Sequence, residues 1–273
     1  MLIAIILKLT TDRNLALPPH LGRANYAATL RRLEEVTPGL GDVAHAGEGP
    51  KPLTCSSLLG HLPRGGQSLI RAGEEVQVRI TGLEARISQA LARGLLEQPP
   101  ATWELDGEVF QVTGVVCDER QHSWTGQATY QELLSTYVHR ADEASAQVQL
   151  EFGSPTAFSS KGLTMPAPLP YLVFGSLADR WNAFSPIPLA SDTRQFVEEN
   201  VALSRFDLHT RPVQTKNSGL YIGAEGMAQY TAVRRDRYWL VALNVLADFA
   251  LFSGVGTQTT IGMGQARRRW PES

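Results

Sequence analysis

The sequence of 273 residues predicts an α+β fold in which one small strand–helix unit occurs twice. In the first half, apolar runs with strand alternation and segments with helical periodicity follow in the order strand, helix, strand, strand, helix, strand. The second half repeats this order of elements, although its residues are not similar to those of the first half. This order is that of the split βαβ, ferredoxin-like (RRM-like) fold. We therefore expect two tandem ferredoxin-like domains with a cleft between their sheets.

In the first half, proline and glycine separate the predicted elements. The apolar run 2–10 predicts a central strand, and apolar residues at helical spacing over 21–36 predict a helix that Thr37-Pro38-Gly39 ends. The polar, glycine-rich segment 40–52 is expected to be a connecting loop. The other predicted elements are two strands, a helix and a final strand or hairpin, over 53–59, 69–80, 83–96 and 103–116.

The second half begins after a polar joint. We place a linker at 121–146, with one short helical piece over 130–139, between an N-terminal domain at 1–120 and a C-terminal domain at 147–273. The predicted elements of the C-terminal domain are strand, helix, strand, strand, helix and strand, over 148–152, 170–184, 203–213, 221–233, 238–252 and 265–270.

Composition and charge exclude several classes of protein. A hydrophobic fraction of 43% and a charged fraction of 19% are those of an ordinary globular protein. The net charge of −2 supplies no overall basic field, so any nucleic-acid binding would need local patches. The apolar runs 2–10 and 238–252 are too short to span a membrane. Cys55 and Cys117 form no metal or redox motif, so we expect reduced thiols in a cytoplasmic protein, with a disulfide as the alternative. No cofactor or metal motif is visible elsewhere.

The segment 254–264 is rich in glycine and threonine, and lies between an apolar helix and a basic strand. Glycine allows positive φ and close backbone approach, and a run of such residues turns its N–H groups outward into a concavity suited to an anion. We therefore expect a phosphate-binding loop, and a long turn that ends the helix is the alternative. The segment lacks the Gly-Lys-Ser/Thr ending of a P-loop, and it follows a helix, whereas a dinucleotide fingerprint follows a strand.

Several short motifs occur along the chain in a recognisable order. From the N-terminus they are a Leu-Pro pair before the first helix, Leu40, His45, Gly49-Pro50-Lys51-Pro52-Leu53-Thr54, Ser56, Phe152-Gly153-Ser154-Pro155-Thr156-Ala157-Phe158, Gly223 to Gly226, and Gly254 to Gly264. Together they resemble the CRISPR repeat-RNA-processing endoribonucleases, the Cas-six family of repeat-associated proteins, over nearly the whole chain. The resemblance implies two tandem ferredoxin-like domains and metal-independent cleavage of the repeats in a precursor transcript to give guide RNAs. It also implies that the glycine-rich loop contacts RNA.

Metal-free RNA cleavage uses the 2′-hydroxyl as the nucleophile on the adjacent phosphate, and leaves a 2′,3′-cyclic phosphate and a 5′-hydroxyl. It needs a base, a cation and an acid for the leaving oxygen. The resemblance implies that His45 is the base, because histidine titrates near neutral pH, and that Lys51 belongs to the same site. Without the resemblance, both residues would be interpreted as exposed surface residues. Some members of the family have a tyrosine late in the first helix, where this chain has Leu30. Tyr26, one helical turn earlier, and His20 are therefore candidates for the proton donor, and an ordinary half-buried tyrosine and a polar residue near a helix start are the alternatives.

Basic side chains near the glycine-rich loop are the candidate phosphate contacts, because phosphate contacts supply affinity and orientation on RNA. The expected RNA-binding residues are Gly254, Gly256, Thr257, Gly262, Gly264, Arg267, Arg268, Arg234 and Arg235, with Lys161 and Lys216 as weaker candidates. An ordinary solvated surface is the alternative for the arginines.

Two functions are compatible with this sequence. The favoured one is an endoribonuclease that acts on CRISPR repeat RNA, and the alternative is a non-catalytic RNA-binding subunit of a CRISPR effector complex with the same fold. An unrelated ferredoxin-like metabolic enzyme has little support, because no cofactor motif is present. Repeat RNA is the expected partner, whereas contact with other effector subunits and the choice between a monomer and a homodimer stay open.

Overall fold

The chain divides into two compact units. The computed structural model describes residues 1–63, 65–139, 144–160, 162–214 and 219–270. The N-terminal unit consists of Met1–Gln127, Gln214–Gly219 and Gln258–Met263, and the C-terminal unit consists of Ala128–Val213, Leu220–Thr257 and Gly264–Ser273. The glycine-rich segment is therefore divided between the units.

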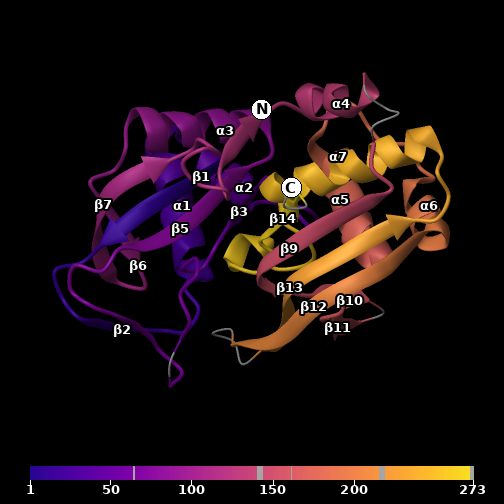
Figure 1. Ribbon diagram of the computed structural model, residues 1–273. Helices are drawn as coiled ribbons and strands as arrows, with labels where there is room; N and C mark the ends of the chain where they lie inside the picture. The colour runs from indigo at the N-terminus through magenta and orange to yellow at the C-terminus, as the bar shows by residue number, and fades with distance from the viewer. Residues whose placement is uncertain (64, 140–143, 161, 215–218, 271–273) are drawn as a thin grey trace. The chain divides into compact units, whose positions relative to one another are not determined.

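The sheet of the N-terminal unit has the strand order β3-β5-β1-β7-β6, in which every neighbouring pair is antiparallel. The elements are β1 (Leu2–Thr10), α1 (Gly22–Val36), α2 (Leu40–His45), β3 (Leu53–Cys55), β5 (Val76–Gly82), α3 (Ala85–Leu91), the π-helical segment η1 (Ala92–Glu97), β6 (Thr102–Leu105) and β7 (Glu108–Val116). Figure 1 shows β1 between β5 and β7, as the prediction of a central strand requires. The order of β3, β5, β1 and β7 is ferredoxin-like, which confirms the predicted fold class for this unit.

The four-stranded sheet of the C-terminal unit has the order β12-β13-β9-β14 (Figure 1). Its elements are β9 (Gln147–Thr156), α5 (Pro170–Phe184), α6 (Thr193–Asn200), β12 (Val201–Gln214), β13 (Leu220–Ala232), α7 (Arg237–Ser253) and β14 (Ala266–Arg269). β9 is antiparallel to both of its neighbours. With α5 after β9 and α7 after β13, this is the ferredoxin-like order a second time.

Shorter elements lie between the main strands of the two sheets along the chain. They are β2 (Leu15–Leu17) paired with β4 (Ser68–Ile70), β8 (Gly126–Ala128) paired with β1, α4 (Tyr130–Val138), β10 (Phe158–Ser160) paired with β11 (Leu163–Met165), and the 3-10 turn η3 (Thr259–Ile261). The expected linker at 121–146 thus includes β8 and α4, and its residues 140–143 lie outside the described ones.

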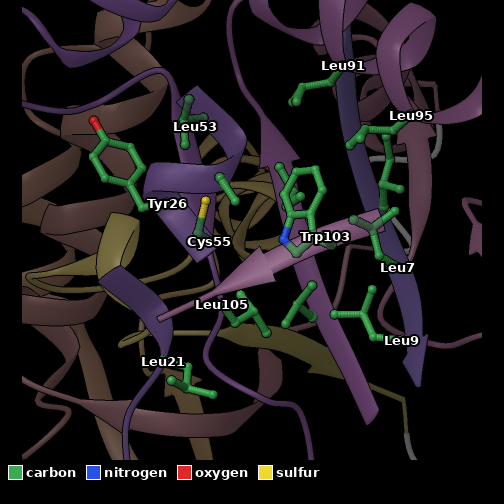
Figure 2. Packing of buried hydrophobic residues seen from close by; sticks show 14 of the residues in the cluster. Leu7, Leu9, Leu21, Tyr26, Leu53, Cys55, Leu91, Leu95, Trp103 and Leu105 are labelled. Atoms are coloured by element: carbon green, nitrogen blue, oxygen red, sulfur yellow. The ribbon is translucent and has the colours of Figure 1, made fainter. Parts of the chain in front are cut away.

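The core of the N-terminal unit joins the sheet to α1 and α3. Leu7 of β1, Leu91 of α3 and Trp103 of β6 are buried in one cluster (Figure 2). The indole Nε1 of Trp103 donates a hydrogen bond of 3.1 Å to Oδ1 of the fully buried Asn25, and so ties β6 to α1. Tyr26 lies at the border of the cluster, and its hydroxyl points away from the other labelled side chains in Figure 2. Asn25 therefore anchors α1 to the sheet, whereas the hydroxyl of Tyr26 lies at the border of the core.

Two predicted elements of the N-terminal half are wrong. Residues 40–45 form the helix α2, where the sequence predicts a loop, because Leu40 and Ala44 are one turn apart and both are buried. Gly39 precedes this helix with φ 81°, a conformation that favours glycine. The strand predicted over 69–80 is divided into β4 and β5 by a turn at Gly73, where φ is 78°.

Other differences concern boundaries. The strand predicted over 53–59 ends at Cys55, and the helix predicted over 83–96 continues beyond Leu91 as the π-helical segment η1. Helix α6 is absent from the sequence prediction because its eight residues follow a proline-rich segment and are mostly polar. Cys55 and Cys117 are both free thiols, so the disulfide alternative does not hold. No helix in the described part of the chain is long and apolar enough to cross a membrane.

Candidate active site

Tyr26 and His45 meet at the C-terminal end of α2. His45 is the last residue of α2 and is exposed, whereas Tyr26 on α1 is only 8% exposed. The hydroxyl oxygen of Tyr26 lies 3.2 Å from Nδ1 of His45, and the two ring centroids are 6.0 Å apart. Within the described residues, Nε2 of His45 has no hydrogen-bond partner. Nε2 is therefore the ring nitrogen that remains for a ligand.

The Tyr26 hydroxyl is neutral at physiological pH. Burial raises the pKa of Tyr26 to about 12, and the neighbouring Cys55 sulfur adds to the shift. A neutral phenol can both donate and accept a hydrogen bond, so it fits either tautomer of His45. If Nδ1 of His45 carries the proton and donates to Tyr26, the lone pair of Nε2 is free to accept a proton.

Lys51 holds the end of α2. Its ammonium Nζ donates to the backbone carbonyls of His45, Ala46 and Gly47 at 2.7, 3.0 and 2.6 Å. An ammonium has three donor hydrogens, and three carbonyls use all of them. A cation is also favourable at the negative end of a helix. Lys51 therefore stabilises the backbone that carries His45, and its hydrogens are not free for a phosphate in this conformation.

His20 lies against the glycine-rich segment, away from His45. Its Nε2 is 2.7 Å from the carbonyl oxygen of Ile261, and a carbonyl only accepts, so Nε2 carries the proton. Burial lowers the pKa of His20, and the hydrogen bond to Ile261 partly offsets the shift. A neutral imidazole whose proton is already bonded is a poor proton donor, so the geometry favours an anchoring role for His20.

Most of the glycine-rich segment is bonded within the protein. The paired amides are those of Gly254, Val255, Gly256, Thr257 and Gly264, which donate to Ala250 O, Gly264 O, Ser176 Oγ, Ala157 O and Pro155 O at 3.0, 2.8, 2.9, 2.8 and 3.0 Å. These five amides do not turn outward, contrary to the expectation of an anion-binding concavity. The side chain of Arg180 also donates to the carbonyl of Gly256 at 2.6 Å. An anion cannot use these amides without displacing their present partners.

Glycine is required at two positions of this segment for reasons of packing. At Gly256, where φ is 79°, a Cβ atom would lie 2.2 Å from the carbonyl oxygen of Ala157. At Gly262, where φ is 104°, it would lie 2.8 Å from the ring of His20 and 2.9 Å from the amide nitrogen of Ser57. Both the positive φ and the close contacts exclude larger residues. The segment thus has the features of the structural turn that the sequence left as an alternative.

The predicted basic clusters have different environments. The side chain of Arg268 is 5% exposed and bonds to Asp248, Tyr137 and Asn244 at 3.2, 2.7 and 2.7 Å. Arg267 pairs with Glu151 at 2.8 Å, and its side chain is 11% exposed. Both arginines are committed to internal partners, so they are poor candidates for phosphate contacts.

The other predicted cations are exposed or lie outside the described residues. Arg234 and Arg235 follow β13, are exposed, and make no hydrogen bond or ion pair with another described residue. They are the arginines of the predicted set that a phosphate could reach. Lys161 and Lys216 lie outside the described residues.

A cavity of about 620 Å³ lies beside α1 in the N-terminal unit. Arg23, Ala24, Ala27 and Arg31 of α1 line it, together with residues before the helix, the turn between β6 and β7, and Ile261. At 100° per residue, this face of α1 differs from the face that carries Tyr26. The cavity and the Tyr26–His45 pair are therefore separate features of one helix.

The comparisons with known proteins agree with this fold. Residues 150–266 match the family described as CRISPR-associated endoribonuclease Cas6. A solved Cas6 product complex is similar over 98% of this chain and 99% of that chain, with a TM-score of 0.80 and 27% identity. This chain therefore resembles Cas6 proteins in its C-terminal sequence and in its whole fold.

Further solved Cas6 structures are similar over the whole fold. A Cas6 substrate mimic complex has a TM-score of 0.74 and 26% identity, over 98% of this chain and 99% of that one. Thermus thermophilus Cas6 has a TM-score of 0.73 and 25% identity, over 98% of each chain. The comparison with curated protein sequences gave no match.

This chain departs from the expected pattern at Leu30. Leu30 is a partly buried side chain packed against the core, so it contributes apolar contacts at the position where the resemblance implies a tyrosine. The hydroxyl beside His45 comes from Tyr26 instead. Helical spacing already placed Tyr26 and Leu30 on one face, but only the position of α2 decides which of them meets His45.

Sequence reasoning missed two groups of residues. Ser176 and Arg180 of α5, one turn apart, hold the peptide groups of Gly256, and nothing in the sequence links them to that segment. The face of α1 that lines the cavity includes Arg23, Ala27 and Arg31 at four-residue intervals. That spacing is a signal that the sequence does contain.

Proposed function

We propose that this protein belongs to the Cas6 family and is a metal-independent endoribonuclease that cleaves CRISPR repeat RNA in a precursor transcript to give guide RNAs. The observation that supports this most is the 3.2 Å contact between Tyr26 and His45, which leaves Nε2 of an exposed histidine without a partner among the described residues. The similar solved structures include a product complex and a substrate mimic complex of Cas6 proteins. Repeat RNA is accordingly the proposed partner.

In the proposed reaction, Nε2 of His45 takes the proton of the 2′-hydroxyl, whose oxygen attacks the adjacent phosphorus. The bond from phosphorus to the 5′-oxygen breaks, so that a 2′,3′-cyclic phosphate and a 5′-hydroxyl result. The hydroxyl oxygen of Tyr26 accepts a hydrogen bond from Nδ1–H of His45 and so holds the ring with Nε2 outward. The proton of His20 is bonded to Ile261, and Tyr26 orients His45, so in the proposed reaction the leaving 5′-oxygen takes the proton that Nε2 of His45 has received.

Lys51 contributes to this reaction through the backbone. By bonding to the carbonyls of His45, Ala46 and Gly47, it fixes the last turn of α2 and therefore the direction of the His45 side chain. Its charge also lowers the energy of an anion near this end of the helix, although the three hydrogens have other partners. The non-catalytic alternative gains no support from the described residues, because it leaves this arrangement around His45 without a role.

The test uses repeat RNA with EDTA in excess over all divalent cations. We expect a single cut in the repeat, with a 2′,3′-cyclic phosphate on the upstream fragment and a 5′-hydroxyl on the downstream fragment. Replacing the 2′-hydroxyl at the cut site with hydrogen should abolish cleavage, whether or not magnesium is present. Cleavage of the 2′-deoxy substrate, or a requirement for a divalent cation, would contradict the proposed mechanism.

A further inference from the structure

The cavity beside α1 is a feature that the proposed chemistry does not use. Its apolar surface comes from Pro18, Pro19, Ala24, Ala27 and Ile261. Its volume of about 620 Å³ lies within the range of pockets that hold small organic ligands, of roughly 300–1,000 Å³. A cavity of this size and character can enclose a flat, weakly polar group.

The walls of the cavity are held in place. The short side chains of Ala24 and Ala27, three residues apart on α1, leave the space open. Another part of the wall is fixed because His20 bonds to the carbonyl of Ile261 at 2.7 Å. A Cβ atom at Gly22 would lie 2.0 Å from the same carbonyl oxygen, so α1 and the turn at Ile261 are in direct contact. The cavity is thus preformed and borders the glycine-rich segment.

Charged groups of both signs line the cavity. Arg23 is exposed and makes no hydrogen bond or ion pair with another described residue, so its guanidinium is available to a phosphate. Arg31 and Glu104 form an ion pair of 3.4 Å, with side chains 53% and 49% exposed. A pair this exposed contributes little to stability and can exchange one partner for a ligand.

The two carboxylates decide which ligand fits. Glu104 and Asp106 would repel a phosphate group inside the cavity, but a carboxylate accepts hydrogen bonds from an exocyclic amino group of a nucleobase. The guanidinium groups of Arg23 and Arg31 can bind the phosphates on either side of that base, or stack on its face. An apolar cavity that is lined by both acceptors and cations matches one unstacked nucleotide better than a free anion.

We propose that this cavity holds one unpaired base of the RNA, an adenine, cytosine or guanine, with its amino group toward Glu104. The proposal rests on the proposed function for the identity of the RNA. A base in this position is read apart from the bond that is cut, because the cavity and the Tyr26–His45 pair lie on different faces of α1. The cavity then contributes to the choice of repeat and not to the chemical step.

The experiment measures binding rather than cleavage, so that it does not depend on the proposed chemistry. The probe is repeat RNA in which bases near the cut site are replaced, one at a time, by analogues that lack the amino group: purine for adenine, hypoxanthine for guanine and pyrimidin-2-one for cytosine. We expect one position at which removing the amino group weakens binding to wild-type protein by about 10-fold or more.

The variants are Ala27→Leu, which fills the cavity, and Glu104→Gln, which removes the carboxylate. Leucine forms helices well, so Ala27→Leu should keep α1 intact. Ala183→Leu, at an exposed helical alanine of α5 that does not line the cavity, is the matched control. We expect Ala27→Leu to bind the natural repeat as weakly as the wild-type protein binds the RNA that lacks the amino group. Removing that amino group should not weaken the binding of Ala27→Leu any further. Ala183→Leu should retain the wild-type discrimination.

The outcomes separate this proposal from the proposed function. Equal affinities of wild type, Ala27→Leu and Glu104→Gln for every RNA would overturn the proposal, whatever the cleavage assay shows. Discrimination that Ala27→Leu removes, in a protein that does not cleave, would support the cavity and reject the endoribonuclease. If Ala27→Leu does not fold, Glu104→Met decides, because it removes both acceptor oxygens, whereas the amide oxygen of Glu104→Gln could still accept from the amino group. A wild-type base preference in Glu104→Met would then overturn the proposal.

Discussion

The hydroxyl of Tyr26 and Nδ1 of His45 lie 3.2 Å apart, although one belongs to the middle of α1 and the other to the last residue of α2. The contact assigns different roles to the two ring nitrogens of His45. The hydroxyl of Tyr26 bonds to Nδ1, and Nε2 remains available to a ligand. This arrangement is what makes His45 suitable as a base, and the predictions below test its parts separately.

Removing the imidazole should stop the chemical step and leave binding unchanged. His45→Ala should slow cleavage of repeat RNA by roughly 10²–10⁴-fold, the usual effect of losing a positioned acid or base. Single-turnover cleavage and equilibrium RNA binding are measured on the same preparation. A His45→Ala protein that cuts at the wild-type rate would reject His45 as the base.

Tyr26→Phe keeps the aromatic ring and removes only the hydroxyl that contacts His45. We expect the rate of cleavage to fall by about 2- to 10-fold, the equivalent of one neutral hydrogen bond, while the affinity for RNA stays the same. The loss should vanish in a His45→Ala background, because Tyr26 then has no imidazole to orient. Equal losses in both backgrounds would show that Tyr26 acts independently of His45, as a proton donor would.

Lys51→Met tests whether Lys51 acts on the backbone of α2. The amide of Ala46 donates to Asp42 at 2.8 Å at the end of this helix, beside the carbonyls that bind Lys51. We expect faster hydrogen exchange of the Ala46 amide and a lower cleavage rate, whereas the salt dependence of RNA binding should not change. An unchanged exchange rate together with a flatter salt dependence would instead indicate direct contact with phosphate.

Arg268 and Arg234 should respond differently to truncation. Arg268→Ala removes the cation beside the partly buried Asp248, so we expect a loss of stability of about 1–3 kcal/mol, measured by chemical denaturation. Arg234→Ala should leave stability unchanged and, if RNA touches this residue, reduce the slope of log K against log salt by up to about one unit. A stable Arg268→Ala protein with a reduced slope would restore Arg268 as a phosphate contact.

His20 should make the stability of the protein depend on pH. Its folded pKa lies below the ordinary value of 6.5, so its contribution is fully present above pH 6.5 and is lost as the pH falls toward the folded pKa. We expect the melting temperature of wild type to fall between pH 7 and pH 5 by more than that of His20→Gln, whose amide can still donate to Ile261. Parallel melting curves for the two proteins over this range would show that His20 is not buried as a neutral imidazole.

The sequence alone determined the order of the elements and, in places, their limits. The strand β1 and the helix α5 occur over the residues that the pattern predicts, 2–10 and 170–184. An uninterrupted apolar run defines β1, and Pro170 at the start and Ser185-Pro186 after the end delimit α5, all of which are local signals. The repeated strand–helix order likewise predicted the two ferredoxin-like sheets that the structure contains.

Only the tertiary structure decided which side chains are available. Arg268 appears in the sequence as part of a basic cluster, but Tyr137, which it contacts at 2.7 Å, is 131 residues away. The amides of the glycine-rich segment appear free in the sequence, but three of them donate to partners in β9, in α5 and directly after β9. Helix α2 exists because Leu40 and Ala44 find a core to enter, and that helix brings His45 to Tyr26. Hydrophobic periodicity predicts the secondary structure of one segment. The free energy of a buried charge or amide depends instead on partners that are distant in the chain.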